Sequence, residues 1–145
     1  MEVEIDPETG ATRMVGHWVV DDVGTVINPL LVKGQIMGGI AQGMGQVLME
    51  DKTYDAEGQV LTGSFMDYAM PRAEDFCNVV IEDNPVPTPT NPLGVKGAGE
   101  AGCVGAMPAV ANAVVNALAE FGIRQIEMPA TPERVWRAIH NGKAG

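Results

Sequence analysis

A glycine-rich segment with one embedded carboxylate is the strongest chemical feature of this sequence. Residues 94–102 read Gly-Val-Lys-Gly-Ala-Gly-Glu-Ala-Gly, and a helical apolar stripe follows over 107–121. Glycines let a backbone come close to a bulky ligand, and N–H groups at a helix N-terminus bind anions or oxo ligands. Glu100 would then be a single carboxylate in a backbone cradle, a candidate general base. The alternative is that Glu100 only caps or charges the start of the helix.

The same letters, 97–102, also match the dinucleotide-binding pattern G-x-G-x-x-G. The residues before them make a poor parallel strand, and the acid about 20 positions on, Glu120, lies at a predicted helix end. Glu100 would also repel phosphates. A P-loop is excluded because no Gly-Lys-Ser/Thr occurs. We therefore do not expect this segment to bind NAD, FAD or a nucleoside triphosphate.

Other polar side chains give weaker signals. No Ser-His-Asp or Cys-His set is credible, and the cysteines, Cys77 and Cys103, are predicted to be small buried hydrophobes. Isolated acids in turns are usually solvated, although they can ligate metals, and three fit this description: Asp21, Asp22 and Asp67. No metal ligand is predicted among them.

The elements that must position the glycine-rich segment begin with a predicted β-hairpin over 2–27. Polar and apolar residues alternate at its start, and residues 6–10 carry the Pro and Gly of a turn. Asn28 and Pro29 are typical of an N-cap and a first helical residue, so a helix is predicted over 29–50. This helix contains five glycines, which indicates that a neighbouring backbone comes close to it.

Short strands are predicted on either side of a turn at 54–60 and over 77–82, and a last helix from Thr131 to near Gly142. The segment 84–92 holds four prolines, so it is either a linker between domains or a stiff extended segment packed on a surface. The fold class is α+β: a β-hairpin and short mixed strands packed with a Gly-rich helix and two C-terminal helices.

Composition restricts the possible partners. The chain has 145 residues, 46% of them hydrophobic, which is enough for a core in one domain or part of one. Its net charge of −10 argues against nucleic acids and anionic membrane surfaces. No uninterrupted apolar stretch reaches the ~18 residues of a membrane span, and the acidic N-terminus is unlike a secretory signal. A reducing cytoplasm is the expected location.

Four ordered motifs together resemble a known family. They are VDDVGTVINP at 20–29 followed by GQIMGGIAQG at 34–43, SFMDYAMP at 64–71, NPLGVKGAGEAG at 91–102 and PATPERVW at 129–136. This set resembles the C-terminal end of the molybdenum-binding large subunit of the xanthine dehydrogenase/aldehyde oxidase family, in its aerobic carbon monoxide dehydrogenase-like branch. The resemblance covers nearly the whole chain.

The resemblance implies a role for the glycine-rich segment. Glu100 would be the catalytic base that takes a proton from a water or hydroxyl on the metal. That oxygen would then attack an electron-poor carbon of carbon monoxide, an aldehyde, a purine or an N-heterocycle, and hydride would pass to a sulfido ligand. The backbone of Lys96, Gly97, Ala98 and Gly99 would touch the molybdopterin cofactor, in its cytosine dinucleotide form, or the oxygen ligands of the metal. Iron–sulfur and FAD subunits would be the partners, together with the remainder of the large subunit.

The family's large subunit is several times longer than this sequence. The resemblance therefore implies a C-terminal fragment, part of a larger molybdenum-cofactor-binding domain and incomplete alone. Such a fragment would expose apolar surface and self-associate. The alternative is a non-catalytic orphan domain that oligomerises without cofactor.

Overall fold

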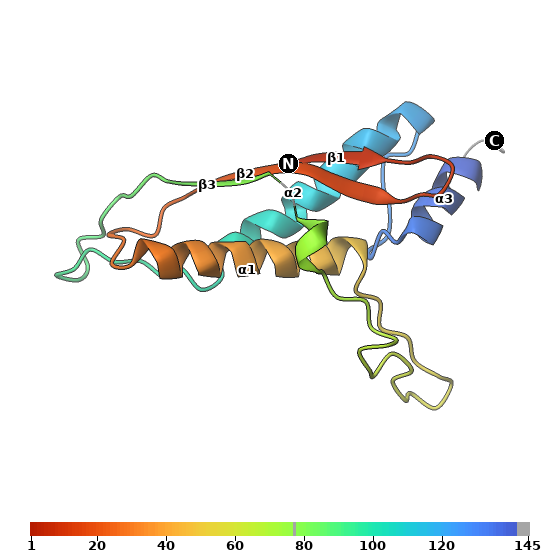
Figure 1. Cartoon of the computed structure of the whole chain (residues 1–145), viewed down its shortest axis with the longest axis horizontal. Coiled ribbons are helices and arrows are strands. Elements are labelled where there is room, and N and C mark those ends of the chain that lie inside the picture. Colours follow the sequence, from red (N-terminus) through yellow and green to blue (C-terminus); the bar gives the residue numbers. More distant parts are fainter. Residues whose placement is uncertain (77, 142–145) are drawn as a thin grey trace.

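The computed structural model describes residues 1–76 and 78–141, and it has an α+β fold (Figure 1). Its elements in chain order are β1 Glu2–Ile5, β2 Thr12–Asp21, α1 Pro29–Leu48, the short 3₁₀ helix η1 Ala73–Asp75, β3 Val79–Asp83, α2 Ala101–Leu118, the 3₁₀ helix η2 Ala119–Phe121 and α3 Pro132–Asn141. The predicted combination of a hairpin, a short mixed sheet, a Gly-rich helix and two C-terminal helices is confirmed.

The sheet has the order β1-β2-β3. The predicted hairpin is confirmed, because β1 and β2 pair antiparallel around a turn closed by a bond of 2.7 Å from Gly10 N to Asp6 O. The strand predicted over 77–82 is found at Val79–Asp83 and pairs parallel with β2. Cys77 lies outside the described residues. Residues Tyr54 and Val60 form one isolated bridge rather than two strands.

Helix α1 begins where Asn28 and Pro29 predict. The Asn28 side chain accepts a hydrogen bond of 3.2 Å from Leu31 N, which satisfies one of the free N–H groups of the first turn. The predicted close approach of a second backbone is also found, with α2 as the neighbour. A Cβ at Gly39 would lie 2.6 Å from Cys103 N, and one at Gly43 would lie 2.8 Å from the Ala106 Cβ.

Helix α2 corrects the sequence prediction at its start. A helix was expected over 107–121 with a glycine-rich loop before it, but α2 begins at Ala101. Its first turns are helical in spite of their glycines because Gly102 packs directly on the backbone of Ile36, which no larger residue would allow. Tertiary contact therefore overrides propensity here. The predicted stop is confirmed, since Gly122 follows η2 with a φ of +79°.

The hydrophobic core lies where α1, α2 and α3 meet under the sheet. Its fully buried side chains include Met44 and Val47 of α1, Leu118 of α2 and Ile139 of α3. The predicted last helix is confirmed as α3, and Thr131 O accepts from Val135 N at its start. The expected end near Gly142 lies outside the described residues.

One segment of the described chain passes a length and composition test for a membrane span, against the sequence expectation. It covers Ala101–Phe121, with a mean hydropathy of 1.5. A core helix of a soluble protein passes the same test, and α2 packs along α1 through Gly39 and Gly43. The finding is therefore weak evidence for a membrane.

Large apolar side chains are exposed on several elements, most of all on the segment between α1 and η1. In Figure 1 this segment extends away from the helices and the sheet. Phe65 and Met66 on it are 91% and 95% exposed, and Leu30 at the start of α1 is 79% exposed. The expected apolar surface is therefore present, and self-association through it remains a prediction.

Candidate functional site

The glycine-rich segment is fixed to the end of β2 by backbone hydrogen bonds. Lys96 N donates to Val23 O at 2.9 Å, and Thr25 N donates to Gly94 O at 3.0 Å. Gly94 has a φ of +68°, a conformation that favours glycine, and it makes the turn into this pairing possible. The path of the chain is thus defined up to Lys96.

Asn91 and the proline-rich segment support the same turn. The Asn91 side chain donates to Val95 O at 3.0 Å and accepts from Val95 N at 3.2 Å. Thr88 N donates to Gly94 O at 3.2 Å, and the Thr88 hydroxyl contacts that of Thr90 at 2.9 Å. Residues 84–88 therefore lie beside the loop and residues 89–92 turn back into it, which agrees with the second of the two alternatives, a segment packed on a surface.

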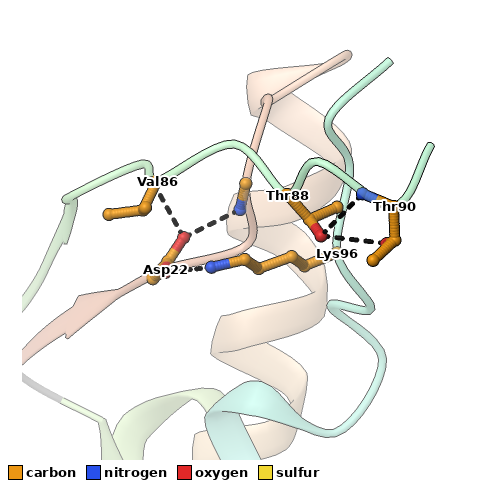
Figure 2. Close-up of polar contacts among 6 residues, drawn as sticks. Asp22, Val86, Thr88, Thr90 and Lys96 are labelled. Atoms are coloured by element: carbon orange, nitrogen blue, oxygen red, sulfur yellow. Dashed lines mark hydrogen bonds and ion pairs between the residues drawn. The ribbon is translucent and has the colours of Figure 1, made fainter. Parts of the chain in front are cut away.

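Asp22 joins three parts of the chain at this place (Figure 2). Its Oδ1 accepts from Gly24 N at 2.9 Å and from Val86 N at 3.0 Å, and its Oδ2 accepts from the Lys96 ammonium. The hydrogen bond from Lys96, followed by those from Val86 and Gly24, lowers the pKa of Asp22 to about 2. Asp22 is therefore a charged carboxylate that ties β2, the proline-rich segment and the loop together.

The next three residues, Gly97 to Gly99, contrast with this network. Across the described parts of the chain, the N–H groups of Gly97, Ala98 and Gly99 have no hydrogen-bond partner. A Cβ at Gly97 or Gly99 would meet no atom within 4 Å, so packing within the described chain gives no reason for glycine there. These positions leave a bare backbone with free donors, open to a group from outside the segment.

Glu100 follows directly, at the N-cap position of α2. Its backbone carbonyl accepts from Val104 N at 3.0 Å, but its side chain makes no capping hydrogen bond. The carboxylate is exposed and has no ion-pair or hydrogen-bond partner within 1–76 and 78–141. The alternative role as a side-chain cap is therefore not seen, although the charge does lie at the positive end of the helix dipole.

A small apolar groove lies beside the loop. It has a volume of about 280 Å³ and is bounded by Ile27 just before α1, by Leu31 in the first turn of α1, and by Val95, Lys96 and Ala98 from the loop. The five predicted site residues, Lys96 to Glu100, are thus contiguous at one end of the α1–α2 pair, next to this groove.

These residues fit a cofactor that offers hydrogen-bond acceptors. The donors are backbone N–H groups without partners among the described residues, and two of them belong to Gly97 and Gly99, which have no Cβ to stand in the way. Among the described residues, no group of three or more His, Cys, Asp or Glu side chains is placed to hold a metal ion. The site therefore offers contacts to the organic part of a cofactor, and a free carboxylate beside it.

Asp22 was predicted from the sequence to be a solvated acid in a turn, but in the structure its carboxylate has three hydrogen-bond partners. Its place in the network was signalled only by Asp22-Val23-Gly24, a pattern typical of a turn in which the side chain binds the N–H two residues on. Its bonds to Val86 and Lys96 come from distant sequence. The other two acids have local roles: Asp67 accepts from the Ser64 hydroxyl at 2.6 Å, and Asp21 pairs with Asp83 across β2 and β3.

Burial raises the pKa of Asp21, and the neighbouring Asp83 carboxylate adds to this. Two acids side by side at the end of a parallel pair repel each other. The pair therefore destabilises the ionised state of Asp21.

Comparison with known protein families gives a match over residues 1–77 to the molybdopterin cofactor-binding domain. Among curated proteins, the chain is 41% identical over 139 residues to the 6-hydroxypseudooxynicotine dehydrogenase complex subunit gamma of Paenarthrobacter nicotinovorans. The aligned part covers 94% of this chain and 17% of that protein. The chain thus spans about a sixth of the length of this relative.

Two solved structures are also similar to this chain over nearly its whole length. The reconstituted CO dehydrogenase from Oligotropha carboxidovorans superposes with a TM-score of 0.90 at 34% identity, covering 97% of this chain and 17% of that one. Quinoline 2-oxidoreductase from Pseudomonas putida 86 superposes with a TM-score of 0.87 at 45% identity, covering 95% of this chain and 18% of that one.

Proposed function

Because this chain belongs to the molybdopterin cofactor-binding domain family of the xanthine dehydrogenase and CO dehydrogenase large subunits, we propose that it forms part of the active site of a molybdenum hydroxylase. In this proposal, residues 96–99 bind the cofactor through their backbone, and Glu100 is the catalytic base. The chain would act together with the rest of a large subunit.

The observation that carries the proposal is the contrast within one short segment. The backbone is firmly bonded up to Lys96, but the N–H groups from Gly97 to Gly99 and the carboxylate of Glu100 have no partners among the described residues. Unpaired donors beside an unpaired carboxylate form a site that an external group completes.

Each part of this site has a defined task. The molybdenum cofactor, when bound, supplies the two-electron oxidation chemistry. The N–H groups of Gly97 and Gly99 would donate to its acceptor atoms and hold it near the start of α2. Glu100 accepts, at a carboxylate oxygen, the proton that the attacking water loses as it adds to the substrate carbon. This carboxylate lies at the positive end of the α2 dipole, at the start of the helix.

The substrate in this proposal is a small molecule with an electron-poor carbon: carbon monoxide, an aldehyde or an N-heterocycle. The names of the relatives, which include a nicotine-derived compound and quinoline, favour the heterocycle. We propose the cytosine dinucleotide form of molybdopterin as the cofactor, and iron–sulfur and FAD subunits as electron acceptors. The exposed apolar residues of this chain would be covered by the remainder of the large subunit.

The cradle is tested by replacing Gly99 with Val in the assembled enzyme. A branched side chain would occupy the space that the backbone leaves open, so we expect molybdenum and pterin content to fall at least several-fold. Gly105→Val is the matched control, because Gly105 is also exposed with no atom near its Cβ position but lies on α2 away from the loop. Normal cofactor content in the Gly99 variant would refute the cradle. An assembled protein without any pterin would favour the non-catalytic alternative.

A further inference from the structure

We propose that Asp22 is a positioning residue that holds the Lys96 ammonium away from Glu100 and so keeps the base free. The consequence for turnover rests on the proposed function of Glu100. The contact itself is a property of this chain and can be tested on the chain alone.

First, the Asp22 carboxylate is held in place by the backbone. Its Oδ1 is bound to two backbone N–H groups, Gly24 at 2.9 Å and Val86 at 3.0 Å, from segments far apart in the sequence. This arrangement leaves Oδ2 directed at the Lys96 ammonium, as Figure 2 shows. The carboxylate is thus fixed by the fold before it meets the lysine, and it acts as an anchor.

The second step is the position of Lys96. It is the last residue of the loop whose backbone is bonded to β2, through the 2.9 Å bond to Val23 O. Only Gly97, Ala98 and Gly99 separate it from Glu100. Among the described residues, no hydrogen bond holds the backbone N–H groups of these three residues, and a Cβ at Gly97 or Gly99 would meet no atom, so the spacing would allow a released lysine to turn toward Glu100.

The third step is the charge around the two residues. On the elements packed against this segment, β2 carries Arg13, His17 and Asp21, β3 carries Glu82 and Asp83, and α1 carries Lys33, while Asp22 follows β2 directly. Among the described residues, Asp22 alone pairs with the Lys96 ammonium, and none forms an ion pair or hydrogen bond with the Glu100 carboxylate. A lysine without Asp22 would therefore have Glu100 as a carboxylate close in sequence, and pairing would occupy the oxygens that must accept a proton.

The ion pair is too exposed for its main effect to be stability. The side chains of Lys96 and Asp22 are 34% and 36% exposed, and ion pairs in such places contribute little to folding. The main effect of the pair is therefore on the position of the Lys96 ammonium and not on the stability of the fold. Loss of the pair should alter where the ammonium lies far more than how firmly the chain folds.

The test begins with Asp22→Asn in the 145-residue chain. Asparagine keeps the Oδ1 acceptor for Gly24 and Val86 but replaces Oδ2 by an amide that does not accept from lysine. We expect nuclear Overhauser contacts between the Lys96 Hε and Glu100 Hγ protons, absent in the native chain, to appear in the variant. Asp22→Ser, whose hydroxyl also closes this turn, provides a second variant if the first does not fold.

The control is Asp51→Asn. Asp51 pairs with Arg134 at 3.1 Å, with exposures of 36% and 35% that match the Asp22 pair. This variant loses an equivalent ion pair away from the loop and should leave the Lys96 and Glu100 signals unchanged. Unchanged signals in both Asp22 variants would overturn the inference.

The second readout is turnover in the assembled enzyme. We expect Asp22→Asn to lower kcat about two- to five-fold with little change in KM and in molybdenum content, from a partly exposed pair. In a Lys96→Met background, whatever the effect of that change itself, Asp22→Asn should not lower kcat further, because the competing ammonium is gone. If Asp22→Asn lowers kcat by the same factor in the Lys96→Met background as in the native enzyme, Asp22 is a structural residue only. That result would contradict the inference.

The two proposals fail in different ways. Full turnover by Glu100→Gln would end the role of Glu100 as base, while the contacts between Lys96 and Glu100 in the free chain would still test the inference. Loss of turnover in Glu100→Gln, with no response of those contacts to Asp22→Asn, would retain the base and reject the positioning role.

Discussion

Gly102 of α2 lies directly on the backbone of Ile36 in α1: a Cβ at Gly102 would be 2.3 Å from the Ile36 carbonyl oxygen. This contact fixes the first turn of α2 against α1, two residues after Glu100. The position of the proposed base is therefore set by a backbone-to-backbone contact between the two central helices, and not by its own side chain.

Replacing Gly102 with Ala should destabilise the fold, because a backbone atom cannot move away as a flexible side chain can. Overpacking of this kind costs about 1–3 kcal/mol, which urea unfolding followed by circular dichroism would measure. The control is Gly105→Ala, where a Cβ meets nothing and should stabilise the helix by about 0.5–1 kcal/mol. Equal effects of the two changes would show that the helices do not touch at Gly102.

The N-cap of α1 gives an independent test of the same helix. Asn28→Ala removes the acceptor for Leu31 N and should lower the free energy of unfolding by about 1 kcal/mol. Asn28→Asp keeps a side-chain acceptor and should retain the stability. If alanine were as stable as the native chain, the cap would have no energetic role.

Asp22 predicts a pH dependence at the acidic end. Its hydrogen bonds lower its pKa from 3.8 to about 2, so the folded state binds fewer protons than the unfolded state between these values. The stabilisation is present above pH 3.8 and is lost as the pH falls toward 2. In Asp22→Asn, the urea midpoint should fall less steeply over this range than in the native chain. If the urea midpoints of the two proteins fell in parallel with pH, the hydrogen bonds to Asp22 would make no contribution to stability.

His17 predicts a second dependence, in a higher range. It is buried in β2 with an Nδ1 that has no partner among the described residues, and burial, then the positive N-terminus, lowers its pKa. The unfolded state takes up the proton first, near pH 6.5, so this contribution to stability is complete above pH 6.5 and declines below it. His17→Leu should remove that decline. An unchanged slope between pH 7 and pH 5 in the variant would contradict it.

The sequence predicted the elements whose signals are local. The hairpin follows from alternation and a Pro-Gly turn, α1 from Asn28 and Pro29, and the end of α2 from Gly122. The glycines of α1 predicted a close neighbour, and Gly39 and Gly43 do contact α2.

The features that the sequence missed depend on distant contacts. The first turns of α2 are helical because Gly102 meets Ile36, which propensity does not reveal. The parallel pairing of β3 with β2 and the bonds from Asp22 to Val86 and Lys96 join segments more than 50 residues apart. A place for Glu100 at a helix start was only the alternative to a loop position, and both this place and the lack of a side-chain partner among the described residues required the structure.

The central claim is that Glu100 is the base of a molybdenum hydroxylase, and turnover per bound molybdenum in the assembled enzyme tests it most directly. Glu100→Gln keeps the size of the side chain and removes its proton-accepting charge, and Glu120→Gln in η2 is the matched control. We predict that the Glu100 variant retains its molybdenum and loses at least about 100-fold in turnover, as expected for general-base catalysis, while the control is unchanged. Turnover of the Glu100 variant at the native rate per molybdenum would contradict the account.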